Sequence, residues 1–157
     1  MINHYILKGI IVNLLKILLK SLLVLIVTGN VLANSSYLIR TDATDAVKSL
    51  LNAAKEHYEK EQFEQAAAIL ERAIRIKPKH PILWHNLAGV RLAQGDWERA
   101  ASLASKSNAI ATKSQNLKEL RIRNWVVITL ACEGMKNEEC TKEARIQAQN
   151  LAKSLAN

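Results

Sequence analysis

The chain has 157 residues, of which 49% are hydrophobic, so it is long enough for one core domain and too short for two of ordinary size. Five Gly, two Pro and 4% aromatic residues argue against a β-sandwich or barrel, while the abundant Ala, Leu, Lys, Glu, Gln and Arg favour helices. The formal net charge is +8, of which residues 1–33 carry +3 and the other residues +5. This excess is too small to indicate a nucleic-acid-binding protein.

Residues 1–33 differ from the rest of the chain. The run Ser21–Ala33 has no charged residue and has the length of the apolar region of a signal peptide, and it is too short to cross a bilayer as a helix. Small side chains at Val31 and Ala33 suit cleavage after Ala33. The alternative is an uncleaved anchor, in which residues 6–32 tilt through the bilayer. In both cases we expect residues 34–43 to form a linker and the remainder to be exported, either in the periplasm or anchored in the inner membrane and facing the periplasm.

From residue 44 to residue 112, apolar residues recur at spacings of three and four, which is the pattern of amphipathic helices. The first helix is capped by Asp42 or Thr44 and extends to about Tyr58. The second begins at Phe63 and ends before Pro78, because proline disfavours a helical conformation in the residue before it.

Two further helices follow. Pro81 suits the first position of the third helix, and Gly95 can end that helix in a left-handed conformation. Asp96 is placed to cap a fourth helix, which extends from Trp97 to about Ile110. The chain therefore repeats a helix–turn–helix unit.

The repeat has a period of 34 residues. This shift superimposes the small or apolar positions at which two antiparallel helices must pack closely: Leu50 on Trp84, Ala54 on Ala88, Phe63 on Trp97, Ala66 on Ala100 and Leu70 on Ala104. The segment from Trp84 to Ala100, W-x-x-L-A-x-x-R-x-x-x-G-x-W-x-x-A, resembles the pattern W-x-x-L-G-x-x-Y-x-x-x-G-x-Y-x-x-A of the tetratricopeptide repeat family. Departures occur at Glu61 and Ala88, where the family has Gly, and at Ser107, which weakens the end of the second repeat.

The resemblance covers about residues 44–112 and implies an all-α fold. The expected architecture is a short right-handed α-solenoid of tetratricopeptide helix–turn–helix repeats, with repeats at about 47–80 and 81–114 in a domain over 44–157.

The C-terminal part departs from the 34-residue period. A third repeat that starts at Gln115 would place Lys118 and Arg121 at apolar positions. We instead expect a longer helix over about 116–134 and a final helix capped by Asn137. Residues 116–156 are then a degenerate third repeat or a capping helix pair, which a solenoid needs to cover its last apolar face.

Cys132 and Cys140 are the only cysteines in the chain. The expected helices place them on either side of one tight turn, where their Cα atoms can come within reach of a disulfide. Behind an export signal, the pair favours one bridge, and the alternative is two buried thiols.

Binding residues are implied by the resemblance. In tetratricopeptide domains, the first helix of each repeat lines a concave groove that binds a peptide or a helix. Carried over by position, the groove residues are Lys48, Leu51, Lys55, Tyr58, Glu59, Ile82, His85, Asn86, Gly89 and Leu92. A clamp for a C-terminal carboxylate, as in some chaperone-binding relatives, is not expected, because Leu51 stands where that clamp has Lys.

No pattern for catalysis or cofactor binding is present. The sequence has no phosphate-binding Gly loop and no Gly-x-Ser-x-Gly motif, and His80 and His85 are not part of a metal-ligand motif. We therefore expect neither an enzyme nor a protein that binds a metal or a cofactor. A basic cluster, Arg72, Arg75, Lys77 and Lys79, is either a solvated helix end or a surface that attracts anionic lipid or an acidic partner.

These observations lead to one functional expectation with two alternatives. We expect a helical adaptor of the bacterial cell envelope that binds another protein in its concave groove. The alternatives are a self-associating module that forms a homodimer through its end faces, and an accessory protein that binds anionic lipid or cell-wall components. An uncleaved N-terminal segment would add contact with the membrane.

Overall fold

The computed structural model describes residues 45–112 and 114–156, which belong to one compact unit. The expected signal peptide or anchor (1–33), the linker (34–43) and both candidate caps of the first helix lie outside these residues. The described part of the chain contains helices and no strands. In chain order, the elements are α2 (Asp45–Glu59), α3 (Phe63–Ile76), α4 (Pro81–Ala93), α5 (Trp97–Ala111), the 3₁₀ helix η1 (Gln115–Leu117), α6 (Lys118–Gly134) and α7 (Glu138–Ala156).

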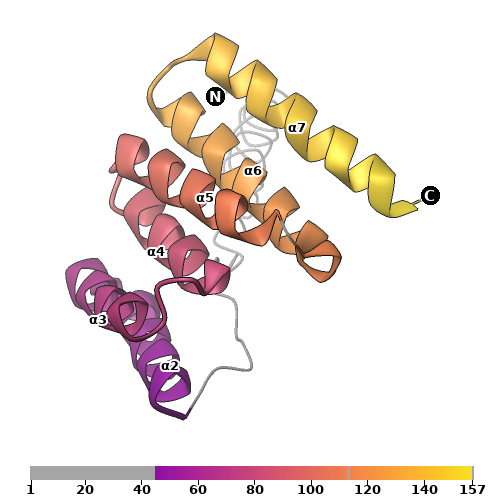
Figure 1. The fold of residues 1–157 in the computed structure, drawn as a ribbon. Helices are drawn as coiled ribbons and strands as arrows, with labels where there is room; N and C mark the ends of the chain where they lie inside the picture. Colours follow the sequence, from indigo (N-terminus) through magenta and orange to yellow (C-terminus); the bar gives the residue numbers. More distant parts are fainter. Residues whose placement is uncertain (1–44, 113, 157) are drawn as a thin grey trace, which may run out of the picture. The chain divides into compact units, whose positions relative to one another are not determined.

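The helices form three pairs that stack in chain order. Helix α2 packs on α3, α4 on α5, and α6 on α7. The pairs follow one another from α2–α3 at the bottom of Figure 1 to α6–α7 at the top, and α4 and α5 both contact α6. The expected all-α fold, built from helix–turn–helix repeats, is confirmed.

The turn inside each pair has the same backbone conformation. One residue in each turn has a left-handed φ: Glu61 (57°), Gly95 (75°) and Lys136 (55°). The next amide donates a hydrogen bond to the carbonyl five residues earlier: Gln62 N to His57 O (2.8 Å), Asp96 N to Arg91 O (2.9 Å) and Asn137 N to Cys132 O (2.9 Å). This is the Schellman arrangement that ends a helix and satisfies one of its last carbonyls. The three turns therefore mark three equivalent helix pairs.

The helix starts also follow from the sequence. Pro81 lies in the first turn of α4, where its missing amide proton is not needed. The side chain of Asp96 accepts a hydrogen bond from the Arg99 amide at the start of α5 (3.4 Å). Asn137 does the same for the amide of Cys140 at the start of α7 (3.0 Å). The expected caps of these helices are confirmed.

Two hydrophobic clusters hold the stack together. The first joins α2, α3 and α4 and contains Val47, Leu51, Ala54, Ala66, Ala67, Leu70, Ala73, Ile74, Leu83, Leu87 and Val90. The second joins α4, α5, α6 and α7 and contains Ala88, Leu92, Ala100, Ala104, Val127, Ile128, Ala131, Cys132 and Ala144. Since α4 contributes to both clusters, it is buried on almost every side. Trp84 packs partly buried against the first cluster, and Trp97 and Trp125 pack against the second.

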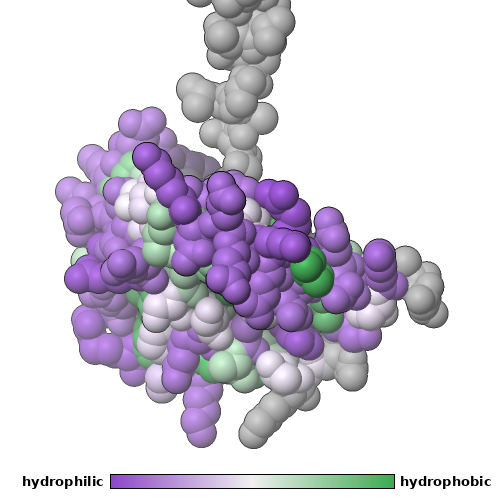
Figure 2. Space-filling model, turned by 90° about the horizontal axis from the view of Figure 1, so that it is seen from above, coloured by the Kyte–Doolittle hydropathy of each residue, from purple (hydrophilic) through white to green (hydrophobic). Residues whose placement is uncertain are grey.

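Helix α7 covers one end of the stack. Among its described side chains, Ala144 is the one buried hydrophobic residue, whereas Ile146 and Leu155 are exposed. Seen from above, the described part of the molecule presents mainly hydrophilic residues, with hydrophobic residues only in small areas (Figure 2). A polar outer face of this kind is what the last helix of a solenoid needs.

Candidate protein-binding groove

The turns give the register of the groove positions in the third helix pair. The left-handed residues are 34 residues apart from Glu61 to Gly95 and 41 residues apart from Gly95 to Lys136. When the residue numbers of the groove positions on α2 are increased by both intervals together, they fall on five residues of α6. They are Arg123, Val126, Leu130, Glu133 and Gly134, which correspond in order to Lys48, Leu51, Lys55, Tyr58 and Glu59.

An apolar hollow of about 370 Å³ lies between α4 and α6, with the start of α5 at its edge. Its lining consists of Leu92, Ala93, Trp97, Leu130 and Gly134. Leu92 is one of the groove residues expected from the sequence, and Leu130 and Gly134 occupy groove positions by the register of the turns. One turn before Leu130 on α6, Val126 is 43% exposed. The groove positions of the second and third pairs therefore meet in one apolar depression.

Close packing of an aromatic ring against backbone shapes this hollow. A Cβ atom added at Gly134 would lie 2.6 Å from Cε2 of Trp97 and would collide with Cδ2 of the same ring. Only a glycine therefore lets the indole lie against the end of α6. The contact fixes Trp97 at the edge of the hollow.

A buried polar network joins α4, α5 and α6. Nδ1 of His85 lies 2.7 Å from Oδ1 of Asn124. The amide nitrogen of Asn124 donates to Oγ of Ser107 (2.8 Å) and to Oδ1 of Asn108 (3.0 Å). Because the Asn124 nitrogen is used in these bonds, its oxygen is the acceptor for His85, so Nδ1 of His85 carries a proton. The four side chains are all buried.

The network extends to the start of α4. The hydroxyl of Ser107 donates to the carbonyl oxygen of Pro81 (2.8 Å). Ser107 thus links α5 to the first residue of α4, while Asn124 links α6 to both. Buried polar groups of this kind tolerate little displacement, because each lost hydrogen bond leaves a desolvated donor or acceptor. The relative position of α4 and α6, and with it the hollow, is held by this network.

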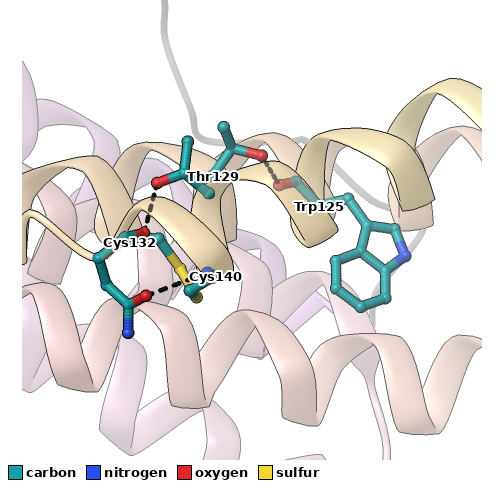
Figure 3. Close-up of a disulfide and its surroundings, with 6 residues drawn as sticks. Trp125, Thr129, Cys132 and Cys140 are labelled. Atoms are coloured by element: carbon teal, nitrogen blue, oxygen red, sulfur yellow. Dashed lines mark hydrogen bonds between the residues drawn. A yellow bond between two sulfur atoms is a disulfide. The ribbon is translucent and has the colours of Figure 1, made fainter.

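A disulfide joins α6 to α7. Cys132 and Cys140 are bridged, with their Cα atoms 5.7 Å apart on either side of the last turn. In Figure 3 the indole of Trp125, two turns before Cys132 on α6, lies away from the bridge. The bridge agrees with the pairing expected from the sequence, and it fixes the capping helix to the helix that lines the groove.

The groove residues expected on α2 present mainly charged side chains. Lys48 and Glu59 are exposed, and Lys55 forms an ion pair with Glu59 (3.4 Å). Leu51 belongs to the first core cluster, and Tyr58 is half-buried against the edge of Phe63, with 5.5 Å between ring centroids.

The groove residues expected on α4 are less accessible than their positions suggest. His85 and Asn86 are 2% and 1% exposed, and Gly89 is also buried. His85 is engaged with Asn124 of α6, so its side chain is not offered to a partner in this structure. Ile82 is half-buried, and Leu92 reaches the surface through the hollow. The structure therefore does not gather all ten expected residues on one open surface.

The sequence alone did not indicate the five groove positions on α6, which are Arg123, Val126, Leu130, Glu133 and Gly134. A strict 34-residue period hides them, because the third pair lies seven residues later than that period requires. The signal that finds them is the turn. Aligning Gly95-Asp96 with Lys136-Asn137 also places Trp125 on Trp84, which restores the repeat.

A second depression, of about 700 Å³, lies along α7 and the turn before it. Its lining is mostly polar or charged and comprises Glu133, Lys136, Asn137, Glu138, Thr141, Lys142, Arg145, Ile146 and Gln149. An ion pair between Arg145 and Glu133 (2.8 Å) crosses this region. It is larger than the hollow, but it offers one exposed apolar side chain, Ile146, for contact.

Two features are absent from residues 45–112 and 114–156. No cluster of three or more His, Cys, Asp or Glu side chains is placed to hold a metal ion. Among these same residues, no helix has the length and apolarity needed to span a membrane.

Three stacked helix pairs with equivalent turns define a short α-solenoid. The tetratricopeptide repeat model matches residues 57–121. The structure is also similar to the globular C-terminal domain of LpoP from P. aeruginosa, with 31% sequence identity and a TM-score of 0.64. This match covers 69% of the chain and 99% of that domain. No curated protein matches the sequence. The chain belongs to the tetratricopeptide repeat family.

Proposed function

We propose that this protein is a scaffold that binds another protein, as a peptide or a helix, in the groove lined by α2, α4 and α6. The observation that carries the proposal is the apolar hollow between α4 and α6, together with the exposed Val126 beside it. Binding sites for peptides and helices commonly combine an apolar pocket with a few polar groups around it.

The groove has two chemically different halves. The α6 half, with Val126 and Leu130, accepts an apolar side chain, whose burial contributes about 1.5–3 kcal/mol. The α2 half carries Lys48 and the Lys55–Glu59 pair, which select the orientation of the partner more than they add to its affinity. Since α4 is held by the polar network, the two halves meet the partner as a preformed surface.

We place this activity in the cell envelope. The support is the signal-peptide-like or anchor-like composition of residues 1–33 and the Cys132–Cys140 bridge, because disulfides persist in oxidising compartments. The function proposed is binding rather than catalysis. The support is the tetratricopeptide repeat fold, whose extended concave surfaces serve in binding.

Site-specific photo-crosslinking tests the groove. A photoreactive benzoylphenylalanine replaces Val126 in the full chain, and a second variant carries it at Ile146, which is equally exposed at 43% but lies on α7. We expect one discrete protein adduct from position 126 and none of that mass from position 146, with the adduct identified by mass spectrometry. Identical adducts from the two positions, or an adduct from position 146 alone, would show that the groove is not the binding surface.

A further inference from the structure

The net positive charge of the domain is concentrated in its middle. Between Arg72 and Lys118 the sequence has nine basic and two acidic residues. The preceding segment, 34–71, has four basic and seven acidic residues, and the following segment, 119–157, has six basic and five acidic residues. The positive charge is therefore concentrated in one segment of the sequence, although the total charge is modest.

The cations in the middle segment are largely unpaired. Arg72, Arg75, Lys77, Lys79 and Lys106, which we call the basic surface, make no ion pair with the described residues. The nearby acids of α3 do not neutralise them, since Glu71 and Glu64 both pair with Arg91 of α4 at 3.0 and 3.8 Å. The positive charge is therefore available to a partner.

Helix geometry places part of the basic surface on one face of α3. Arg75 and Ile76 lie three and four residues after Arg72, and all three are exposed, with Ile76 at 48%. An exposed isoleucine among unpaired cations is not explained by the core, because the core residues of α3, such as Leu70 and Ala73, lie on its other side. This face is thus both apolar and basic.

The loop after α3 and one residue of α5 extend the same surface. The indole nitrogen of Trp84 donates to the carbonyl of Pro78 (2.8 Å), which holds the loop with Lys77 and Lys79 against α4. Nζ of Lys106 lies 6.0 Å from the centroid of the Trp84 ring, in cation–π contact. Lys106 and the loop that carries Lys77 and Lys79 thus both lie against the half-buried indole of Trp84. In this loop, burial and the adjacent Lys77 lower the pKa of His80, so His80 remains uncharged near pH 7.

We infer that the basic surface binds the headgroup region of a membrane that contains anionic phospholipids. Lysine and arginine side chains around an isoleucine and a tryptophan match the layered chemistry of that region, where phosphates lie beside the first acyl carbons. A purely ionic acidic ligand would satisfy the cations but would make no use of the exposed Ile76.

The position of the domain in the chain agrees with this occupant. The eleven residues 34–44 connect Ala33 to the start of α2. At 3.3–3.6 Å per residue they reach at most about 40 Å. If residues 1–33 remain as an anchor, the basic surface stays within reach of the bilayer that holds them. The inference itself does not depend on the anchor or on the groove.

Vesicle co-sedimentation tests the inference with residues 34–157, which contain the whole compact unit Tyr37–Asn157. The match to the globular domain of LpoP covers 99% of that domain and 69% of this chain. Vesicles of phosphatidylcholine and phosphatidylglycerol in equal parts should bind the domain, whereas vesicles of phosphatidylcholine alone should not. Binding should weaken as salt is raised, because exposed charges are screened over about 8 Å at physiological ionic strength.

Matched variants assign the binding to this surface. Replacing Arg72, Arg75 and Lys79 by Gln should lower binding to the mixed vesicles about 100-fold, at roughly fivefold per cation. Replacing Lys60, Lys142 and Lys153 by Gln removes the same charge from exposed positions elsewhere and should lower it by less than tenfold. Equal effects of the two triple variants would overturn the assignment, provided that circular dichroism shows both to be folded.

The variant Ile76→Ser separates a membrane from a soluble acidic partner. It should weaken binding to the mixed vesicles several-fold and leave binding to soluble polyglutamate unchanged. Failure of the wild-type domain to bind mixed vesicles, or tighter binding to polyglutamate with no effect of Ile76→Ser on vesicles, would overturn the inference. Neither result would affect the groove proposal, whose test uses positions on α6 and α7.

Discussion

The two junctions between helix pairs are held together by different kinds of contact. Between the first and second pairs, α4 is packed through hydrophobic side chains such as Leu83, Leu87 and Val90. Between the second and third pairs, the same helix uses a buried polar network through His85 and Asn124, and leaves an apolar hollow beside Leu92. The turns have the same backbone conformation in all three pairs, whereas the contacts at the two junctions differ in chemistry.

The difference bears on the proposed binding function. Hydrophobic packing is non-directional and adapts to substitution, whereas a hydrogen-bonded network fixes one arrangement. The second junction therefore holds α4 and α6 in a defined position around a space that is not filled by the protein itself. The groove half that the junction supports is apolar, while the half on α2 is charged.

The largest expected effect comes from removing the centre of the network. Asn124→Ala leaves His85, Ser107 and Asn108 without their shared partner in a buried site, and we expect it to lower the free energy of unfolding by about 3 kcal/mol. Chemical denaturation measures this change. Asn52→Ala, at an exposed position of α2, is the control and should change it by less than about 0.5 kcal/mol. Equal effects would mean that the second junction is not held by hydrogen bonds.

The disulfide inside the third pair, next to the second junction, sharpens the comparison. Replacing Cys132 and Cys140 by Ser should lower the free energy of unfolding by about 2.5 kcal/mol, mainly because the unfolded chain gains freedom. Denaturation with and without reductant measures it. The wild-type protein should lose this amount on reduction, and the double Ser variant should be insensitive to reductant. Sensitivity of the Ser variant would show that the effect does not come from this bridge.

Gly134→Ala tests the packing at the edge of the hollow. The added methyl group collides with the ring of Trp97, so we expect a loss of about 2 kcal/mol in the free energy of unfolding and a shift in tryptophan fluorescence. A second substitution, Trp97→Leu, should make the change at position 134 close to neutral. If Gly134→Ala is equally costly in both backgrounds, the indole does not lie against this glycine.

The smallest expected effect concerns the turns inside the three helix pairs, which have the same backbone conformation. Glu61 and Lys136 adopt a left-handed φ that Gly95 adopts without strain, so Glu61→Gly or Lys136→Gly should raise the free energy of unfolding by about 1 kcal/mol. Gly95→Ala should lower it by a similar amount, even though the added methyl group meets only ordinary contacts. Melting curves of the three variants measure this, and a stabilisation at one turn only would contradict their equivalence.

Much of the fold could be predicted because its signals are local. Pro81, Gly95, Asp96 and Asn137 act within one turn of the backbone, and the structure uses each as expected. The spacing of apolar residues likewise predicted the α-helices from α2 to α7, but not the 3₁₀ helix η1, which occupies the start of the expected helix over about 116–134. Glu61 was read as a departure from the family pattern, yet it takes the same backbone conformation as the glycine it replaces.

The site was harder to predict because its contacts are between helices distant in the sequence. Ser107 looked like a weakness in the second repeat, and only its bonds to Pro81 and Asn124 give it a role. The family positions include Leu92, which lines the hollow, but they could not indicate that His85 is covered by α6. Val126 and Leu130 could not be recognised with a fixed 34-residue period, because the interval to the third turn is longer.

The affinity of the crosslinked partner for two matched variants tests the central claim most directly. Val126→Asp and Ile146→Asp each place a carboxylate at a side chain that is 43% exposed, the first on the groove and the second on α7. Both should retain the circular dichroism and melting temperature of the wild-type protein. The account predicts that Val126→Asp weakens binding at least about 30-fold, as expected for a central contact, and that Ile146→Asp changes it less than about twofold. Equal affinities of the two variants, or a loss confined to Ile146→Asp, would contradict a binding groove between α4 and α6.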